Sequence, residues 1–261
     1  MKLLFLGTGA ADYAVKPEEQ MTENDRRYSS ILADGEFLLD AAPQSFGFAQ
    51  RCEVDFSKIK FVLVSHTHYD HYCKESVVNF AKQSGRKLKL FCHEDAVERL
   101  GLTEEDRQYV EPAGVKIMSA FETEGYKITP LAANHIVDGS PEVPLHYIIE
   151  DKDGKRYFYG CDGGWFVALT WEYMRKLKFD GMILEATVGD KDGDFRLGTH
   201  NSIPMLRLIV AALWENKMID DNTRLIASHI ARTLHVSYED TSEKLKQIGI
   251  DTAFDGFEAE F

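Results

Sequence analysis

Apolar runs of a few residues, separated by polar turns and longer amphipathic stretches, divide the chain into strands and helices. Nearly unbroken apolar runs predict strands that are buried on both faces, at 2–6, 61–64, 181–184 and 224–227. Mixed apolar stretches predict further strands at 30–33, 36–39, 87–92, 126–133, 147–149 and 156–161. Helical patterns occupy 44–51, 74–84, 165–178, 202–217 and 238–248. These elements predict an α/β protein.

Turn and cap residues support these boundaries. Asp34-Gly35 and Asp153-Gly154 each predict a hairpin, because Asp-Gly readily adopts the backbone that a tight hairpin turn needs. Pro204 is tolerated only in the first turn of the helix near 202–217, so Asn201 or Ser202 is the expected N-cap.

Length and charge limit the kinds of protein that this chain can be. At 261 residues with 44% hydrophobic content, it can form one large domain over residues 1–261 with a substantial core. The formal net charge of -13 argues against a large nucleic-acid-binding surface. No apolar stretch approaches the length of a membrane span, and the apolar start before Gly7 is too short for a signal peptide.

The four cysteines are scattered and form no C-x-x-C pair. They therefore indicate neither a disulfide framework nor a cysteine-rich zinc site. Reduced cysteines are typical of the cytoplasm, which is the expected location.

The segment Ser65-His66-Thr67-His68-Tyr69-Asp70-His71 follows the buried strand at 61–64 directly. Open α/β sheets bind ligands at the ends of such strands. His66 and His68 are two residues apart, so an extended segment can direct both imidazoles the same way. Asp70 and His71 can face a second point nearby. Nitrogen and oxygen donors of this kind suit zinc, manganese or iron, so the segment predicts a metal site.

The pattern H-x-H-x-D-H after an apolar strand resembles the metal-binding signature of the metallo-β-lactamase superfamily. The resemblance spans nearly the whole chain and implies a four-layer αββα sandwich of two mixed sheets flanked by helices. It implies two divalent metal ions, Zn²⁺, Mn²⁺ or iron. By this resemblance His66, His68 and His135 hold one ion, Asp70, His71 and His229 hold the other, and Asp162 bridges them. Asp70 is thereby also a catalytic residue.

Two further segments resemble the phosphodiesterase branch of the superfamily, which includes tRNA 3′-processing ribonucleases and a phosphonate-pathway cyclic phosphodiesterase. They are Leu184-Glu185-Ala186-Thr187 and Gly198-Thr199-His200-Asn201-Ser202. The resemblance implies that His200 donates a proton to the leaving oxygen and that Glu185 orients His200. It also implies that Asp40, at a strand end, supports the metal loop through a hydrogen bond.

The implied substrate is a small phosphodiester or cyclic nucleotide. The chain between Glu185 and His200 is short and acidic, whereas tRNA-processing relatives have a long basic arm there. Arg26, Arg27 and Ser202 are the candidate substrate-binding residues. A homodimer is one option for the oligomeric state, because dimers are common among such enzymes.

Other functions stay open at this point. The same two-metal site could hydrolyse a lactone, a thioester or a β-lactam, and His200 would then be dispensable. A redox module that holds iron is less favoured, because such relatives often have glutamate at the position of His68. The other histidines, His93, His146 and His235, are expected at structural or surface positions.

Overall fold

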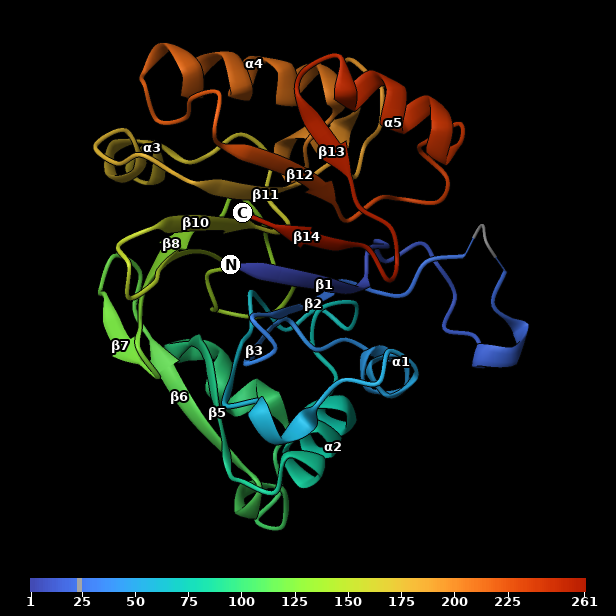
Figure 1. The fold of residues 1–261 in the computed structure, drawn as a ribbon, viewed down its shortest axis with the longest axis vertical. Helices are drawn as coiled ribbons and strands as arrows, with labels where there is room; N and C mark the ends of the chain where they lie inside the picture. Colours follow the sequence, from blue (N-terminus) through green and yellow to red (C-terminus); the bar gives the residue numbers. More distant parts are fainter. Residues whose placement is uncertain (23–24) are drawn as a thin grey trace. The chain divides into compact units, whose positions relative to one another are not determined.

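The computed structural model describes residues 1–22 and 25–261, which divide into two compact units (Figure 1). Unit 1 comprises residues 1–115, 137–142 and 254–260, and unit 2 comprises residues 116–136, 143–253 and 261. Within the described residues, each unit contains one seven-stranded sheet and its own helices. That residues 1–261 form a single domain stays a prediction.

The sheet of unit 1 has the strand order β14-β1-β2-β3-β4-β5-β6. Its strands are β1 (Lys2–Gly7), β2 (Ser30–Ala33), β3 (Phe37–Leu39), β4 (Phe61–Leu63), β5 (Leu88–His93), β6 (Val110–Val115) and β14 (Glu258–Glu260). The pairs from β14 to β3 are antiparallel, and those from β3 to β6 are parallel, so the sheet is mixed. Asp34 and Gly35 form the predicted hairpin turn with φ angles of 52° and 68°.

The helices of unit 1 are α1 (Ser45–Arg51), α2 (Lys74–Ser84) and the 3-10 helices η1 (Glu18–Gln20), η2 (Phe56–Lys58), η3 (Glu94–Leu100) and η4 (Asp106–Gln108). Side chains of α1 and α2 pack against one face of this sheet. Val62 of β4 belongs to the same buried cluster as Phe80 of α2. Phe61 and Leu63, which point to the other face of the sheet, are also fully buried. The unbroken apolar run at β4 therefore did predict a strand buried on both faces.

The sheet of unit 2 has the strand order β13-β12-β11-β10-β9-β8-β7. Its strands are β7 (Phe121–Thr123), β8 (Tyr126–Ala132), β9 (Leu145–Glu150), β10 (Arg156–Gly160), β11 (Gly181–Glu185), β12 (Arg224–Ser228) and β13 (Ile250–Thr252). The strands from β7 to β10 pair antiparallel, and those from β10 to β13 pair parallel.

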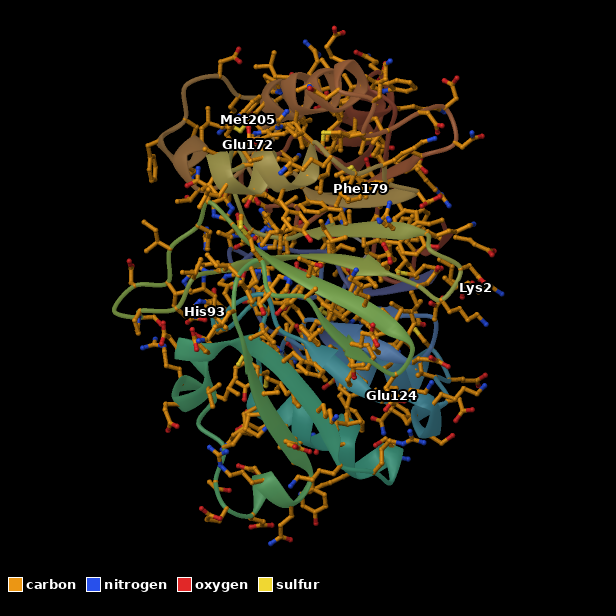
Figure 2. The ribbon with its side chains drawn as sticks, turned by 90° about the vertical axis from the view of Figure 1, so that its left-hand side faces the viewer. Lys2, His93, Glu124, Glu172, Phe179 and Met205 are labelled. Atoms are coloured by element: carbon orange, nitrogen blue, oxygen red, sulfur yellow. The ribbon has the colours of Figure 1, made fainter. Side chains whose placement is uncertain are left out.

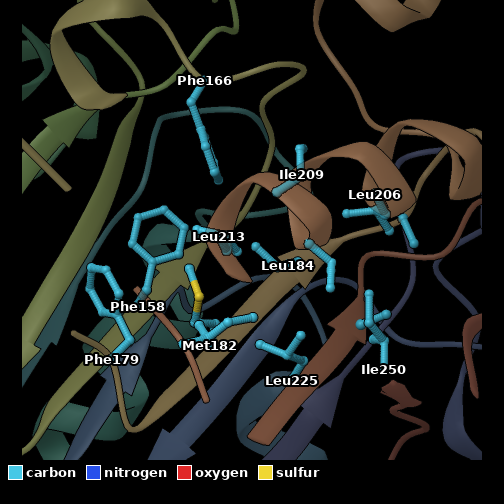
Figure 3. Packing of buried hydrophobic residues seen from close by; sticks show 14 of the residues in the cluster. Phe158, Phe166, Phe179, Met182, Leu184, Leu206, Ile209, Leu213, Leu225 and Ile250 are labelled. Carbon is cyan, nitrogen blue, oxygen red and sulfur yellow. The ribbon is translucent and has the colours of Figure 1, made fainter. Parts of the chain in front are cut away.

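Unit 2 contains the helices α3 (Ala168–Met174), α4 (Ile203–Glu215) and α5 (Tyr238–Lys246), with the 3-10 helix η5 (Phe195–Gly198). Helices α4 and α5 cover the same face of β11–β13 (Figure 1). Figure 3 shows the apolar core between these helices and the sheet, where Met182 and Leu184 of β11 pack near Leu206 and Leu213 of α4. Lys2 at the start of β1 and Glu124 between β7 and β8 have exposed side chains (Figure 2).

The predicted α/β class, two mixed sheets flanked by helices, is confirmed. Most predicted elements are present, and α2 has its predicted range, while the ends of the other helices are up to four residues shorter than predicted. The largest shortening is in α3, predicted at 165–178 and observed at Ala168–Met174. Its end tightens into a turn in which Leu177 N–H donates to the Met174 carbonyl at 2.9 Å.

Strands β6, β7 and β14 were not predicted. In β6 the sequence Val-Glu-Pro-Ala-Gly-Val contains a proline and a glycine, which argue against a central strand. The strand lies at the edge of its sheet, where a proline is tolerated because one row of backbone groups has no partner strand.

Across 1–22 and 25–261, every helix is too short or too polar to cross a membrane.

Candidate metal centre

In unit 1, the loop that follows β4 groups four potential metal ligands. The ring nitrogens His66 Nε2 and His68 Nδ1 lie 2.9 Å apart. His71 Nε2 lies 3.6 Å from Asp70 Oδ2, and both of these side chains are buried. The loop folds back on itself, because His71 N–H donates to the His68 carbonyl at 3.0 Å. The sequence motif thus forms two adjacent pairs of donors, as its spacing predicted.

Asp40, just after β3, holds this loop through hydrogen bonds to Ser65 and His71. Its carboxylate accepts hydrogen bonds from Ser65 N–H at 2.6 Å and from Ser65 Oγ at 2.8 Å. Asp40 Oδ2 also lies 2.8 Å from His71 Nδ1. With a proton on Nδ1, His71 directs the lone pair of Nε2 away from Asp40, which is the tautomer that a metal ligand needs.

In unit 2, three strand ends bring His135, Asp162 and His229 together. They follow β8, β10 and β12, respectively. His135 Nε2 lies 3.6 Å from Asp162 Oδ2, and His229 Nε2 lies 3.0 Å from Asp162 Oδ1. Each oxygen of the Asp162 carboxylate therefore faces a different histidine.

The outer nitrogens of these two histidines have hydrogen-bond partners within unit 2. His135 Nδ1 lies 3.2 Å from the Thr199 carbonyl, and His229 Nδ1 lies 2.8 Å from Thr187 Oγ1. Thr187 Oγ1 donates to Glu185 Oε2 at 2.5 Å, so the hydroxyl oxygen is available to accept from His229. The network assigns the proton to Nδ1 in both rings and leaves Nε2 facing Asp162.

Two glycines after Asp162 allow the chain to pack closely at this point. A Cβ on Gly163 would lie 2.8 Å from Cε1 of His146, and one on Gly164 would lie 2.7 Å from the Leu197 carbonyl oxygen. His146 is fully buried between Phe158 and Phe166, and burial lowers its pKa to about 3. His146 is therefore a neutral structural residue of β9, as expected.

The donor sets in both units fit metal ions. They consist of imidazole nitrogens and carboxylate oxygens, and His71, His135 and His229 each have a second nitrogen held by another group. Metal-bound histidines characteristically have such a partner, which fixes the ring and its tautomer.

Comparison with known proteins identifies the family. The model of the β-lactamase superfamily domain matches residues 36–252, most of the chain. The chain belongs to the β-lactamase superfamily. No curated protein sequence matches it significantly.

Solved structures agree with this membership. The metallo-β-lactamase fold protein YhfI from Bacillus subtilis matches with a TM-score of 0.75 and 16% identity, over 100% of this chain and 99% of its own. A diphosphatase from the PhnP family matches with a TM-score of 0.71 and 22% identity, over 100% and 96%. Human tRNase Z, short form, matches with a TM-score of 0.71 and 16% identity, over 100% and 99%. The predicted metallo-β-lactamase fold is thereby confirmed, and the predicted class of metal-dependent hydrolase is supported.

In this superfamily member, His200 lies beside the Asp162 group. Its ring is 4.9 Å from the His135 ring and stacks 5.9 Å from the His229 ring. Burial alone would lower the pKa of His200, but the carboxylates of Asp162 and Glu185 outweigh it and raise the pKa above its ordinary value. The raised pKa favours the protonated form of His200, which is the form that a general acid uses.

Glu185 differs in detail from its predicted role. Its Oε1 is 3.6 Å from His200 Nδ1, longer than a hydrogen bond. Glu185 instead accepts from Thr187 N–H at 2.8 Å and from Asn201 N–H at 2.5 Å. Glu185 therefore influences His200 through its charge and by holding the backbone N–H of Asn201. It is linked to His229 through the hydroxyl of Thr187.

The three candidate substrate-binding residues have different surroundings. Ser202 is buried, and its Oγ caps α4 by accepting from Met205 N–H at 3.3 Å. Arg27 is buried, pairs with Asp255 at 3.1 Å and covers the Phe48 ring at 3.8 Å. Arg26 is half-buried, and its NH1 donates to Thr8 Oγ1 at 2.5 Å. Of the three, Arg26 is the least buried.

The supporting roles of Thr187 and Asn201 were not predicted from the sequence. Thr187 connects Glu185 to His229, and Asn201 Nδ2 donates to the Gly163 carbonyl at 2.9 Å. Both residues lie within the two segments that resemble the phosphodiesterase branch, so those segments were the available signal.

Proposed function

We propose that this protein is a dinuclear metal-dependent hydrolase that holds two divalent ions. His66, His68 and His135 bind one ion, and Asp70, His71 and His229 bind the other. Asp162 bridges the two. Zinc, manganese and iron all suit this donor set.

The orientation of Asp162 is the observation that carries this proposal. Its two carboxylate oxygens face Nε2 atoms of two different histidines, at 3.6 Å and 3.0 Å. A carboxylate that bound a single ion would not require its two oxygens to face two different histidines. A carboxylate placed in this way could hold one cation with each oxygen and so join the two ions of a two-metal site.

We further propose that the reaction is hydrolysis of a phosphodiester. The metal ions, when bound, supply hydroxide at neutral pH and offset the negative charge that develops on the phosphoryl group. His200 donates a proton to the leaving oxygen, a contribution of about 10²–10⁴-fold. The charges of Asp162 and Glu185 favour the protonated form of His200, and Glu185 holds the start of α4 through Asn201 N–H.

Two considerations bear on the substrate, the first on its chemistry and the second on its size. The matched structures include a diphosphatase and a tRNase Z, whose names favour a phosphate-containing substrate. The segment between Glu185 and His200 holds only the short helix η5 and turns, and it is rich in aspartate. A short phosphodiester or a cyclic nucleotide fits such a protein better than a folded RNA does.

The test combines metal analysis with substrate assays on the purified protein. We expect two ions per chain and turnover of bis(p-nitrophenyl) phosphate, with cyclic nucleotides and short dinucleotides tested in parallel. His200→Asn should keep both ions and lower kcat about 10²–10⁴-fold, because it removes only the proton donor. His68→Ala should lose an ion and the activity together.

Two results would count against this function. Hydrolysis of a lactone or thioester panel without any phosphodiester turnover would assign the site to a carbonyl substrate. Full kcat in His200→Asn would remove the general acid from the mechanism.

A further inference from the structure

A buried glutamate in unit 1 holds the turn that contains His66 and His68. Glu142 lies in the segment 137–142, and its side chain is completely buried. Its Oε2 accepts from Thr67 N–H at 3.2 Å, and its Oε1 accepts a short hydrogen bond from Thr67 Oγ1. Thr67 is the residue between the two histidines of the H-x-H motif.

The other partners of Glu142 hold it in place. Ser140 Oγ donates to Oε1 at 3.0 Å, and Glu142 N–H donates back to Ser140 Oγ at 3.2 Å. The guanidinium of Arg99 lies 3.7 Å from Oε1 and also donates to the Gly139 carbonyl at 3.3 Å. Burial, together with the nearby charge of Glu142, raises the pKa of Cys92 to about 12.

This arrangement needs an explanation, because burying a carboxylate is unfavourable unless hydrogen bonds and a counter-charge offset the loss of water. Glu142 has both, yet it touches none of the ligand atoms. Its two oxygens bind the backbone and the hydroxyl of one residue, so they fix both the position and the rotation of that peptide. A fixed peptide at Thr67 limits how far the His66 and His68 rings can separate or turn.

We propose that Glu142 is a positioning residue that sets the affinity of the His66–His68 pair for its metal ion. The inference rests on the proposed function, because it assumes that this pair binds metal. Groups that orient the ligands of a metal site without touching the metal change its affinity by about 10–100-fold when they are removed. Neither the charge nor the spacing of Glu142 in the sequence marks it for this role.

The experiment measures metal affinity directly, by competition with a chelator of known affinity for Zn²⁺. The original protein is compared with Glu142→Ala, Glu142→Gln and Thr67→Val. Glu98→Gln is the matched control, because Glu98 is an exposed glutamate next to Arg99. Thermal unfolding of each metal-free protein, recorded alongside, separates metal affinity from the stability of the fold.

We expect Glu142→Ala to bind one of its ions about 10–100-fold more weakly and Glu98→Gln to match the original protein. Glu142→Gln should recover part of the affinity, because its amide oxygen can still accept from Thr67. Thr67→Val should lose less than Glu142→Ala, since it keeps the backbone N–H. If Glu142→Ala does not fold, the last two variants still test the proposal.

Unchanged affinity in Glu142→Ala, with or without a lower melting temperature of the metal-free protein, would overturn the positioning role and leave the proposed function intact. Unchanged affinity in both Glu142→Gln and Thr67→Val would also overturn it. If the original protein binds no metal, the proposed function fails as well, and the two failures are thus distinguishable.

Discussion

Two candidate site residues, Asp40 and His229, have a backbone conformation that side chains rarely adopt. Their φ angles are 57° and 55°, in the left-handed region. Such conformations cost on the order of 1–3 kcal/mol and persist where surrounding contacts enforce them. At Asp40 the enforcing contacts are the backbone hydrogen bond from its N–H to the Leu63 carbonyl, 2.8 Å long, and the side-chain bonds to Ser65 and His71.

Asp40→Asn tests the role of the Asp40 carboxylate without disturbing the backbone, since asparagine tolerates a positive φ. The variant loses the carboxylate that orients His71 and Ser65. We expect metal affinity to fall about 10–100-fold, as measured by chelator competition.

Asp34→Asn is the control for this prediction. Asp34 has a φ of 52° in the hairpin turn, and its carboxylate accepts from Lys2 N–H at 2.7 Å, outside the metal loop. Equal metal affinity in both variants would contradict the role given to Asp40.

At the scale of elements, the turn after β10 directs Asp162 because Gly163 lets the backbone approach His146. In Gly163→Ala the new Cβ would lie 2.8 Å from a buried ring that has nowhere to move. We expect a loss of about 1–3 kcal/mol in the free energy of unfolding, measured in urea, and weaker metal binding.

Gly47→Ala in α1 provides the opposite case, because a Cβ there meets nothing within 4 Å. A glycine inside a helix is less stable than alanine by roughly 0.5–1 kcal/mol, so this variant should gain stability. If Gly163→Ala and Gly47→Ala lost similar amounts of unfolding free energy, close packing at Gly163 would not be the cause of its destabilisation.

Local sequence signals account for how well each element was predicted. The range of α2 is as predicted, because an apolar face with Val77 and Phe80 stops at Gly85, whose φ is 70°. The ligand candidates from His66 to His71 were predicted from their spacing after an apolar strand, whereas His135, Asp162 and His229 were predicted from the resemblance to the superfamily. Strand β6 was not predicted, because Pro112 is tolerated only in a strand at the edge of a sheet, and the sequence does not show which strands lie at an edge.

The supporting contacts of the site were harder to predict than its ligands. Glu142 and Thr67 are 75 residues apart, and the bond between them depends on how the chain folds rather than on any local pattern. Arg27 and Asp255 are separated by 228 residues for the same reason. A charged residue alone in a sequence gives no sign that it will be buried with a partner.

At the scale of a whole unit, Asp255 connects the end of the chain to its beginning. Its carboxylate accepts from Thr8 N–H and Thr8 Oγ1 after β1, and from Arg27 N–H and the Arg27 guanidinium. Asp255→Ala leaves a buried arginine without this partner. We expect a loss of about 3–5 kcal/mol in the free energy of unfolding, measured by urea denaturation.

Asp251→Ala serves as the control, because Asp251 is half exposed and pairs with Arg224 at the surface. A surface pair of this kind contributes about 0–1 kcal/mol. A comparable loss in both variants would mean that the buried connection at Asp255 adds no special stability.

Metal binding should stabilise the molecule as a whole, because the ligands are assembled only in the folded chain. An ion that binds the native state alone adds about 2.7 kcal/mol when its concentration is 100 times the dissociation constant. Removing metal with a chelator should therefore lower the melting temperature, and adding Zn²⁺ or Mn²⁺ back should restore it. His68→Ala should show a much smaller response to either treatment, while His200→Asn should respond like the original protein, since His200 is not a proposed ligand. Calorimetry of the three proteins with and without metal checks this, and equal responses in all of them would place the stabilising ion outside the proposed centre.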